Sequence, residues 1–82
     1  EESVKIECHN RLAGVMIDRF GKDVTMIKKD IDHFNVNVKV AVSKQFLAWV
    51  MALGNDAKII GPDWVVQQVK DELKRLYELY DK

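Results

Sequence analysis

The sequence predicts an α+β fold of the ferredoxin-like type: a βαββαβ sandwich with a four-stranded antiparallel sheet, two helices on one face, and a further C-terminal α-helix. Two segments predict strands because apolar residues occupy every second position, and two others predict amphipathic helices because apolar residues recur every three or four positions. The third observation is the order of the segments, β-α-β-β-α-β and then α. Right-handed crossovers would place the first and third strands in the middle of the sheet.

Composition sets the class of protein. The chain has 82 residues, 48% of them hydrophobic, and 13 basic residues balance 13 acidic ones. This predicts one domain over residues 1–82, although a chain of this length buries only about 60% of its unfolded surface. The longest apolar run, Phe46–Leu53, is far shorter than the roughly 18 residues that cross a membrane, and the first residues do not form a signal peptide. A single cysteine excludes a disulfide framework and favours a reducing, cytoplasmic location.

The first strand is predicted at Val4–Cys8, where apolar and polar residues alternate. Asn10 is expected to cap the following helix, because an asparagine side chain can accept a hydrogen bond from the first turn. The helix is expected to end at Phe20, and Gly21 stands where a C-terminal cap glycine belongs. Its apolar face consists of residues at helical spacing, Leu12, Val15, Met16 and Phe20.

The next two strands are predicted to form a hairpin. Val24–Ile27 is a short β-prone run, the polar stretch Lys28–His33 supplies the turn, and Phe34–Val42 has the clearest alternation in the chain. Strict alternation assigns the two faces of the central strands, since a slip of one residue would invert them. We expect Val4, Ile6, Val36, Val38 and Val40 to face the helices, and Lys5, Glu7, Asn35, Asn37 and Lys39 to face away.

The remaining elements follow from capping and stop signals. Ser43 is expected to cap a second helix that ends at Leu53, before Gly54 and Asn55. Residues 57–60 predict the fourth strand, and a long helix is expected from Trp64 to Tyr80. The polar face of that helix predicts ion pairs at i, i+4 spacing, Asp71 with Arg75 and Glu78 with Lys82.

No arrangement of residues predicts catalysis, a metal site or a bound cofactor. Cys8 and His9 are adjacent in a strand, so their side chains point to opposite faces, and the spacing of a zinc site is absent. Ser43 is explained by its capping role, and Asp30 and Asp32 fall in a turn, where aspartate bonds to the local backbone. The glycines are scattered and form no phosphate-binding loop. We therefore expect that the chain is not an enzyme.

Apolar residues exceed what one small core needs. Phe46–Leu53 contains no polar residue, so either the other helices cover its whole circumference or part of it packs on another domain or subunit. The last helix carries an apolar stripe about five turns long, which folds onto the sheet or pairs with a symmetry mate. The candidate interface residues are Leu47, Met51, Leu76, Tyr77 and Tyr80.

The ordered series of segments resembles the WCX domain, the C-terminal extension of WYL-domain bacterial transcriptional regulators. The resemblance covers nearly the whole chain and is most specific at residues 46–54 and 57–62. It also includes the opening strand at residues 4–7, the helix end at residues 18–21, the strand at residues 36–40, and the helix with Tyr77 and Tyr80. The resemblance implies a ferredoxin-like domain that assists dimerisation or effector response. In that family a winged-helix domain binds DNA and the WYL domain is the presumed effector sensor.

The leading hypothesis is a non-catalytic regulatory domain, the C-terminal fragment of a longer regulator. It would mediate dimerisation or dock onto the sensor domain, and help transmit effector binding to a DNA-binding domain outside this sequence. Its expected partners are a second copy, as a homodimer, and the upstream WYL and winged-helix domains. Direct binding to duplex DNA or to a membrane is not expected, because acidic and basic residues interleave. The alternative is an independent small-molecule-sensing module of ACT type, which shares the topology and leaves little fixed sequence trace.

Overall fold

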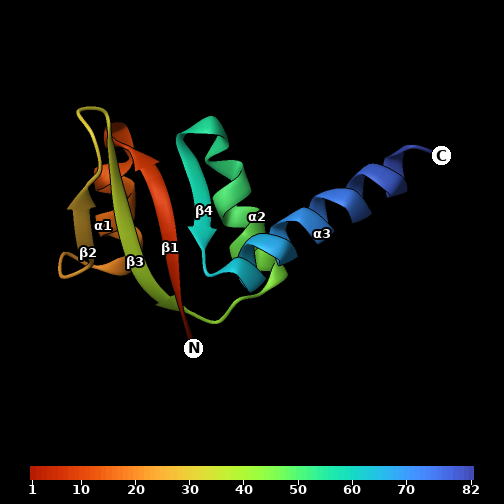
Figure 1. Cartoon of the computed structure of the whole chain (residues 1–82), viewed down its shortest axis with the longest axis horizontal. Helices are drawn as coiled ribbons and strands as arrows, with labels where there is room; N and C mark the ends of the chain where they lie inside the picture. The colour runs from red at the N-terminus through yellow and green to blue at the C-terminus, as the bar shows by residue number, and fades with distance from the viewer.

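The computed structural model describes residues 1–82 as four strands and three α-helices, with two short 3-10 helices (Figure 1). In chain order the elements are β1 Glu2–His9, η1 Asn10–Leu12, α1 Ala13–Phe20, β2 Thr25–Lys28, β3 His33–Val40, α2 Lys44–Ala52, η2 Gly54–Asp56, β4 Ala57–Gly61 and α3 Asp63–Tyr80. The predicted order βαββαβ followed by a helix is confirmed, and with it the α+β, ferredoxin-like fold class. The third strand ends at Val40 rather than at the predicted Val42.

The sheet has the strand order β2-β3-β1-β4, and every neighbouring pair is antiparallel. The predicted central position of β1 and β3 is therefore confirmed. Their register places Val4 opposite Val38 and Ile6 opposite Val36, so that apolar side chains share one face. Cross-strand pairs of this kind are the unit by which a sheet is stabilised.

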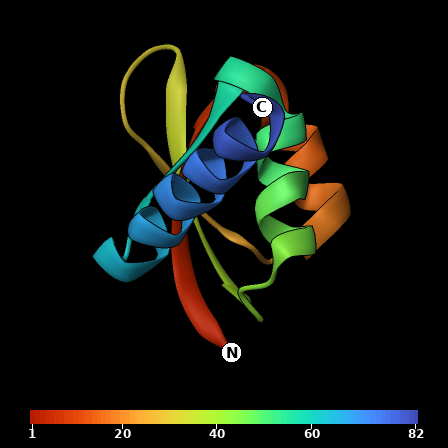
Figure 2. The same cartoon turned by 90° about the vertical axis from the view of Figure 1, so that its right-hand side faces the viewer.

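One face of the sheet is covered by α1 and α2 and the other is open (Figure 2). The central valines and isoleucine predicted to face the helices are buried, except Val40, which is half-buried at the end of its strand. Lys5, Asn37 and Lys39 are exposed on the open face, as alternation predicts. The core consists of thirteen residues, Val4, Ile6, Cys8, Leu12, Met16, Phe34, Val36, Val38, Phe46, Leu47, Val50, Ile59 and Val65.

Two predicted helix caps are confirmed and one is wrong. The backbone N–H of Phe46 donates to Ser43 Oγ at 3.1 Å, and Gly21 ends α1 with a positive φ of 94°. At the other end of α1, Asn10 is not the cap. The ring of His9 accepts the backbone N–H of Arg11 and begins η1, because the chain tightens into a 3-10 turn before α1 starts. The Asn10 side chain instead donates to the carbonyl oxygen of Ile31 at 2.8 Å.

The predicted i, i+4 ion pairs on α3 are also corrected. Arg75 Nη2 lies 2.6 Å from Glu72 Oε1, so arginine pairs one turn back at i, i+3 spacing rather than with Asp71. Asp71 accepts a hydrogen bond from Gln67 instead. No Glu78–Lys82 pair forms, because the helix ends at Tyr80 and Lys82 lies beyond it. Pairs at three and four residues lie close in energy, so local rotamers choose between them.

The two helices with excess apolar residues differ in how the domain covers them. In α2, Phe46, Leu47 and Val50 are buried, and the Trp49 ring lies edge-on to Phe20 with a centroid distance of 5.6 Å. In α3 only the first turns meet the domain, through contacts with β4, and its one buried residue is Val65. The later turns extend beyond the sheet and the other helices, along the 42 Å long axis of the molecule (Figures 1 and 2).

Candidate interaction surfaces

The projecting part of α3, residues 73–80, carries large apolar side chains that the domain leaves uncovered; we call it the α3 arm. Leu73, Tyr77 and Tyr80 are 51%, 69% and 82% exposed. Leu79 is also exposed, and Leu76 is half-buried. Contiguous exposed leucine and tyrosine side chains on a small domain mark interaction sites, because their hydration is unfavourable. The arm is therefore the first candidate interaction surface.

A groove lies at the base of the arm, where α3 leaves the domain; we call it the α2–β4 groove. Its volume is about 260 Å³ and most of its lining is apolar. Two lysines, Lys58 from β4 and Lys70 from α3, are its only charged lining residues. The apolar lining comes from three elements, Leu47, Val50 and Met51 of α2, Ala57 and Ile59 of β4, and Val66 and Val69 of α3.

The structure divides the five candidate interface residues between these two places. Leu47 and Met51 line the groove, and Leu47, at 4% exposure, contributes to the core as well. Leu76, Tyr77 and Tyr80 lie on the arm. Sequence reasoning did not select Leu73 or Leu79 as interface residues. Leu73 sits one helical turn before Tyr77, so its place in the stripe could have identified it.

Charges on the arm lie mostly away from its apolar stripe. The Arg75 guanidinium donates to Glu72, which lowers the pKa of that carboxyl and raises the pKa of Arg75. The Arg75 side chain is half exposed, so solvent screens the pair and it contributes little to stability. The last turn of α3 contains no basic residue. The carbonyl end of the helix carries partial negative charge, and no basic side chain within its last turn offsets that charge.

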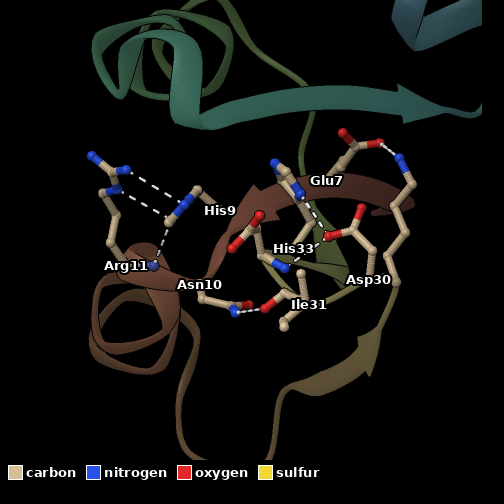
Figure 3. A network of polar contacts seen from close by, with 9 residues as sticks. Glu7, His9, Asn10, Arg11, Asp30, Ile31 and His33 are labelled. Carbon is tan, nitrogen blue, oxygen red and sulfur yellow. Dashed lines mark hydrogen bonds and ion pairs between the residues drawn. The ribbon is translucent and has the colours of Figure 1, made fainter.

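A polar network occupies the end of the sheet where β1 meets the turn between β2 and β3 (Figure 3). The His9 ring accepts hydrogen bonds from Arg11, and Asn10 binds the carbonyl of Ile31. Within the turn, the His33 ring donates to Asp30 at 2.8 Å and lowers the pKa of that carboxyl. The bond from Asn10 to Ile31 joins η1 to the turn, so the network fixes this end of the fold.

A second part of the network joins Glu7 to Lys29 at 2.6 Å, as the dashed line in Figure 3 shows. The hydrogen bond from Lys29 is the largest cause of the lowered pKa of Glu7. Since Lys29 lies in the turn and Glu7 lies in β1, the pair adds another link between them.

The candidate chemical groups are occupied with structural contacts. Cys8 is fully buried, and burial raises its pKa to about 11, so the thiol stays protonated at neutral pH. Both ring nitrogens of His9 lie within reach of Arg11, whose guanidinium also approaches Asp56 at 3.5 Å. The chain contains no group of three or more histidine, cysteine or acidic side chains placed to hold a metal ion. Its helices are all too short or too polar to span a membrane.

Comparison with known proteins identifies the family. The family model described as the WCX domain matches residues 1–77, which is nearly the whole chain. No curated protein and no solved structure matches it. The WCX family is associated with WYL transcriptional regulators rather than with enzymes, and it points to a regulatory domain of such a regulator. The ordered strands, the apolar α2 and the amphipathic α3 agree with that match, and the chain belongs to the WCX domain family.

Proposed function

We propose that this domain, as one unit over residues 1–82, is a non-catalytic regulatory module of a cytoplasmic bacterial transcriptional regulator. It docks through the α3 arm onto another protein surface, and so helps transmit effector binding to the DNA-binding domain of the regulator. The candidate surfaces are the neighbouring WYL domain and a second subunit. The observation that carries this proposal is the exposure of Leu73, Tyr77 and Tyr80 along one side of a helix that projects from the domain.

The energetics favour docking through both the arm and the groove. Fully burying a large apolar side chain contributes about 1.5–3 kcal/mol. Association costs roughly 4–15 kcal/mol in lost freedom of motion, so the arm alone gives at most a weak complex. The α2–β4 groove lies at the base of the arm and adds apolar surface from Met51 and Val69. A partner that covers both surfaces buries more apolar side chains than one that covers the arm alone.

The test uses the complete regulator and a reporter gene under its promoter. A Tyr77→Ser, Tyr80→Ser double variant is expected to lose most of the effector-dependent change in transcription, because it removes the two most exposed rings of the arm. The matched control is Lys74→Ser, which changes an exposed residue on the polar side of the same helix. Immunoblotting checks that the variants accumulate equally. A full effector response from the tyrosine variant would show that the arm plays no part in regulation.

A further inference from the structure

We infer that the α3 arm packs on a second copy of this chain, with the two α3 helices antiparallel and each arm end seated at the partner's α2–β4 groove. This inference rests on the proposed function and specifies its partner and geometry. The structure supplies both halves of the contact, an uncovered apolar arm and an apolar groove at its base. Under one two-fold axis, each copy places its arm at the partner's groove and receives the partner's arm at its own groove, so the assembly is complete at two chains.

The spacing of apolar residues on α3 favours helix pairing. Val66, Val69, Leu73, Leu76 and Tyr80 follow one another at alternating intervals of three and four residues. This is the interval that lets two helices pack side chains of one into spaces on the other. The first members of the series touch their own domain, Leu76 is half-buried, and Leu73 and Tyr80 are exposed. The stripe is continuous, so a partner helix can follow it directly from the arm to the groove.

The position of the domain on α3 sets the register. Val65 is fully buried in the core of its own chain, so a partner helix cannot cover the stripe that far back. Placing Tyr80 opposite the partner's Val69 stops the overlap at the groove. That register also places Leu73 opposite the partner's Leu76, and the two-fold axis repeats both contacts. The overlap of residues 69–80 is about 17 Å long at 1.5 Å per residue.

Charges agree with this arrangement. The end of α3 carries the negative end of the helix dipole, and its last turn has no basic side chain. The groove that receives it is lined by Lys58 and Lys70, with no acidic residue. Asp81, which follows the helix, comes close to the partner's Lys70 in this register. Glu78 lies on the side of α3 opposite Leu76 and Tyr80, so it faces solvent.

The first experiment measures the mass of the 82-residue chain by sedimentation equilibrium from micromolar to submillimolar concentration. The expected result is a reversible monomer–dimer equilibrium. Replacing Tyr80 with serine should shift it at least severalfold toward the monomer, because Tyr80 enters the groove. Tyr80 is 82% exposed in the single chain, so this variant should fold normally, as circular dichroism would confirm. A monomer at all concentrations, or assembly larger than two chains, would overturn the inference.

The second experiment determines the orientation of the helices by disulfide formation. The antiparallel register predicts that Val69→Cys and Tyr80→Cys chains cross-link when they are mixed, and that neither cross-links with itself. A parallel pair would give the opposite result, because equal positions would then face each other. Native Cys8 is fully buried and does not compete. If Val69→Cys weakens the fold, the exposed neighbouring change Lys70→Cys takes its place in the same mixture.

The third experiment tests the charges. Lys70→Glu and Asp81→Lys should each weaken dimerisation severalfold, and the double variant should recover much of the loss, because it restores opposite charges across the interface. Glu78→Lys on the far side of the helix is the control and should leave the equilibrium unchanged. Additive losses in the double variant would refute the predicted contact.

These measurements separate the inference from the proposed function. If the chain remains monomeric while Tyr77→Ser, Tyr80→Ser still abolishes the effector response, the arm docks on another domain and the second-copy inference is wrong. If the chain dimerises as described but the effector response is normal, the inference stands and the proposed function is wrong.

Discussion

Replacing Val38 with aspartate should unfold most of the protein at neutral pH. Val38 is 4% exposed, lies in the central strand β3 and stands opposite the fully buried Val4. Loss of its burial removes about 1.5–3 kcal/mol. A carboxylate without a partner in that position costs several kcal/mol more, roughly 2–7 kcal/mol for an unbonded polar group. The sum is comparable with the total stability of about 5–15 kcal/mol that small domains have.

The matched control is Lys39→Asp, which places the same side chain one residue later on the open face of the sheet. Urea unfolding followed by circular dichroism measures both variants against the parent. The control should remain within about 0.5 kcal/mol of the parent, as surface substitutions usually do. Burial raises the pKa of the carboxyl at position 38 above the unfolded value of about 3.9. The penalty should therefore shrink as the pH falls through that raised pKa, and equal stability of the two variants at neutral pH would refute the facing assignment.

Four further predictions concern single groups. Ser43→Ala should lower the free energy of unfolding by about 1 kcal/mol, because it removes the cap of α2, whereas Ser43→Thr should preserve most of it in the same urea titration. The pKa of Glu7 is lowered, so its bond to Lys29 stabilises the fold above the ordinary carboxyl pKa of 4.5. This stabilisation is lost as the pH falls through the lowered pKa. Glu7→Gln should therefore reduce the pH dependence of the free energy of unfolding in this acid range. Cys8 should react with a thiol reagent only as fast as the chain opens, since the native thiol is buried with a pKa of about 11, and rapid labelling of the folded protein would contradict this. In fluorescence anisotropy, duplex DNA should bind with a Kd no tighter than roughly 10⁻⁴ M at physiological salt. Saturable binding at micromolar concentration would instead show that the domain binds nucleic acid.

Local patterns identified most of the fold correctly. The alternation in residues 34–40 assigned each side chain of β3 to a face, because a strand directs successive side chains to opposite sides. Ser43 and Gly21 marked helix ends, since their side chain or backbone freedom satisfies groups within one turn. These signals depend on neighbours in the sequence, so the rest of the fold does not alter them.

The errors in detail occurred where several neighbours compete for one group. Asn10 and His9 are both placed to cap the first helical turn. His9 caps it, because the Asn10 side chain donates instead to the carbonyl oxygen of Ile31 in the turn. On α3, Arg75 had acidic neighbours at two spacings, and it pairs with Glu72. Such choices depend on contacts from distant residues or on rotamers, neither of which periodicity describes.

The sequence by itself determined the order of the elements, the faces of the central strands and the amphipathic character of α3. Only the tertiary structure decided which turns of that helix the domain covers. β4, on which α3 packs, has 5 residues and α3 has 18. β4 is about 17 Å long and α3 is about 27 Å long, so the later turns of α3 extend past the end of the strand on which the helix packs. An apolar stripe looks the same in the sequence whether a core lies beneath it or not, and so the arm and its groove appear only in three dimensions.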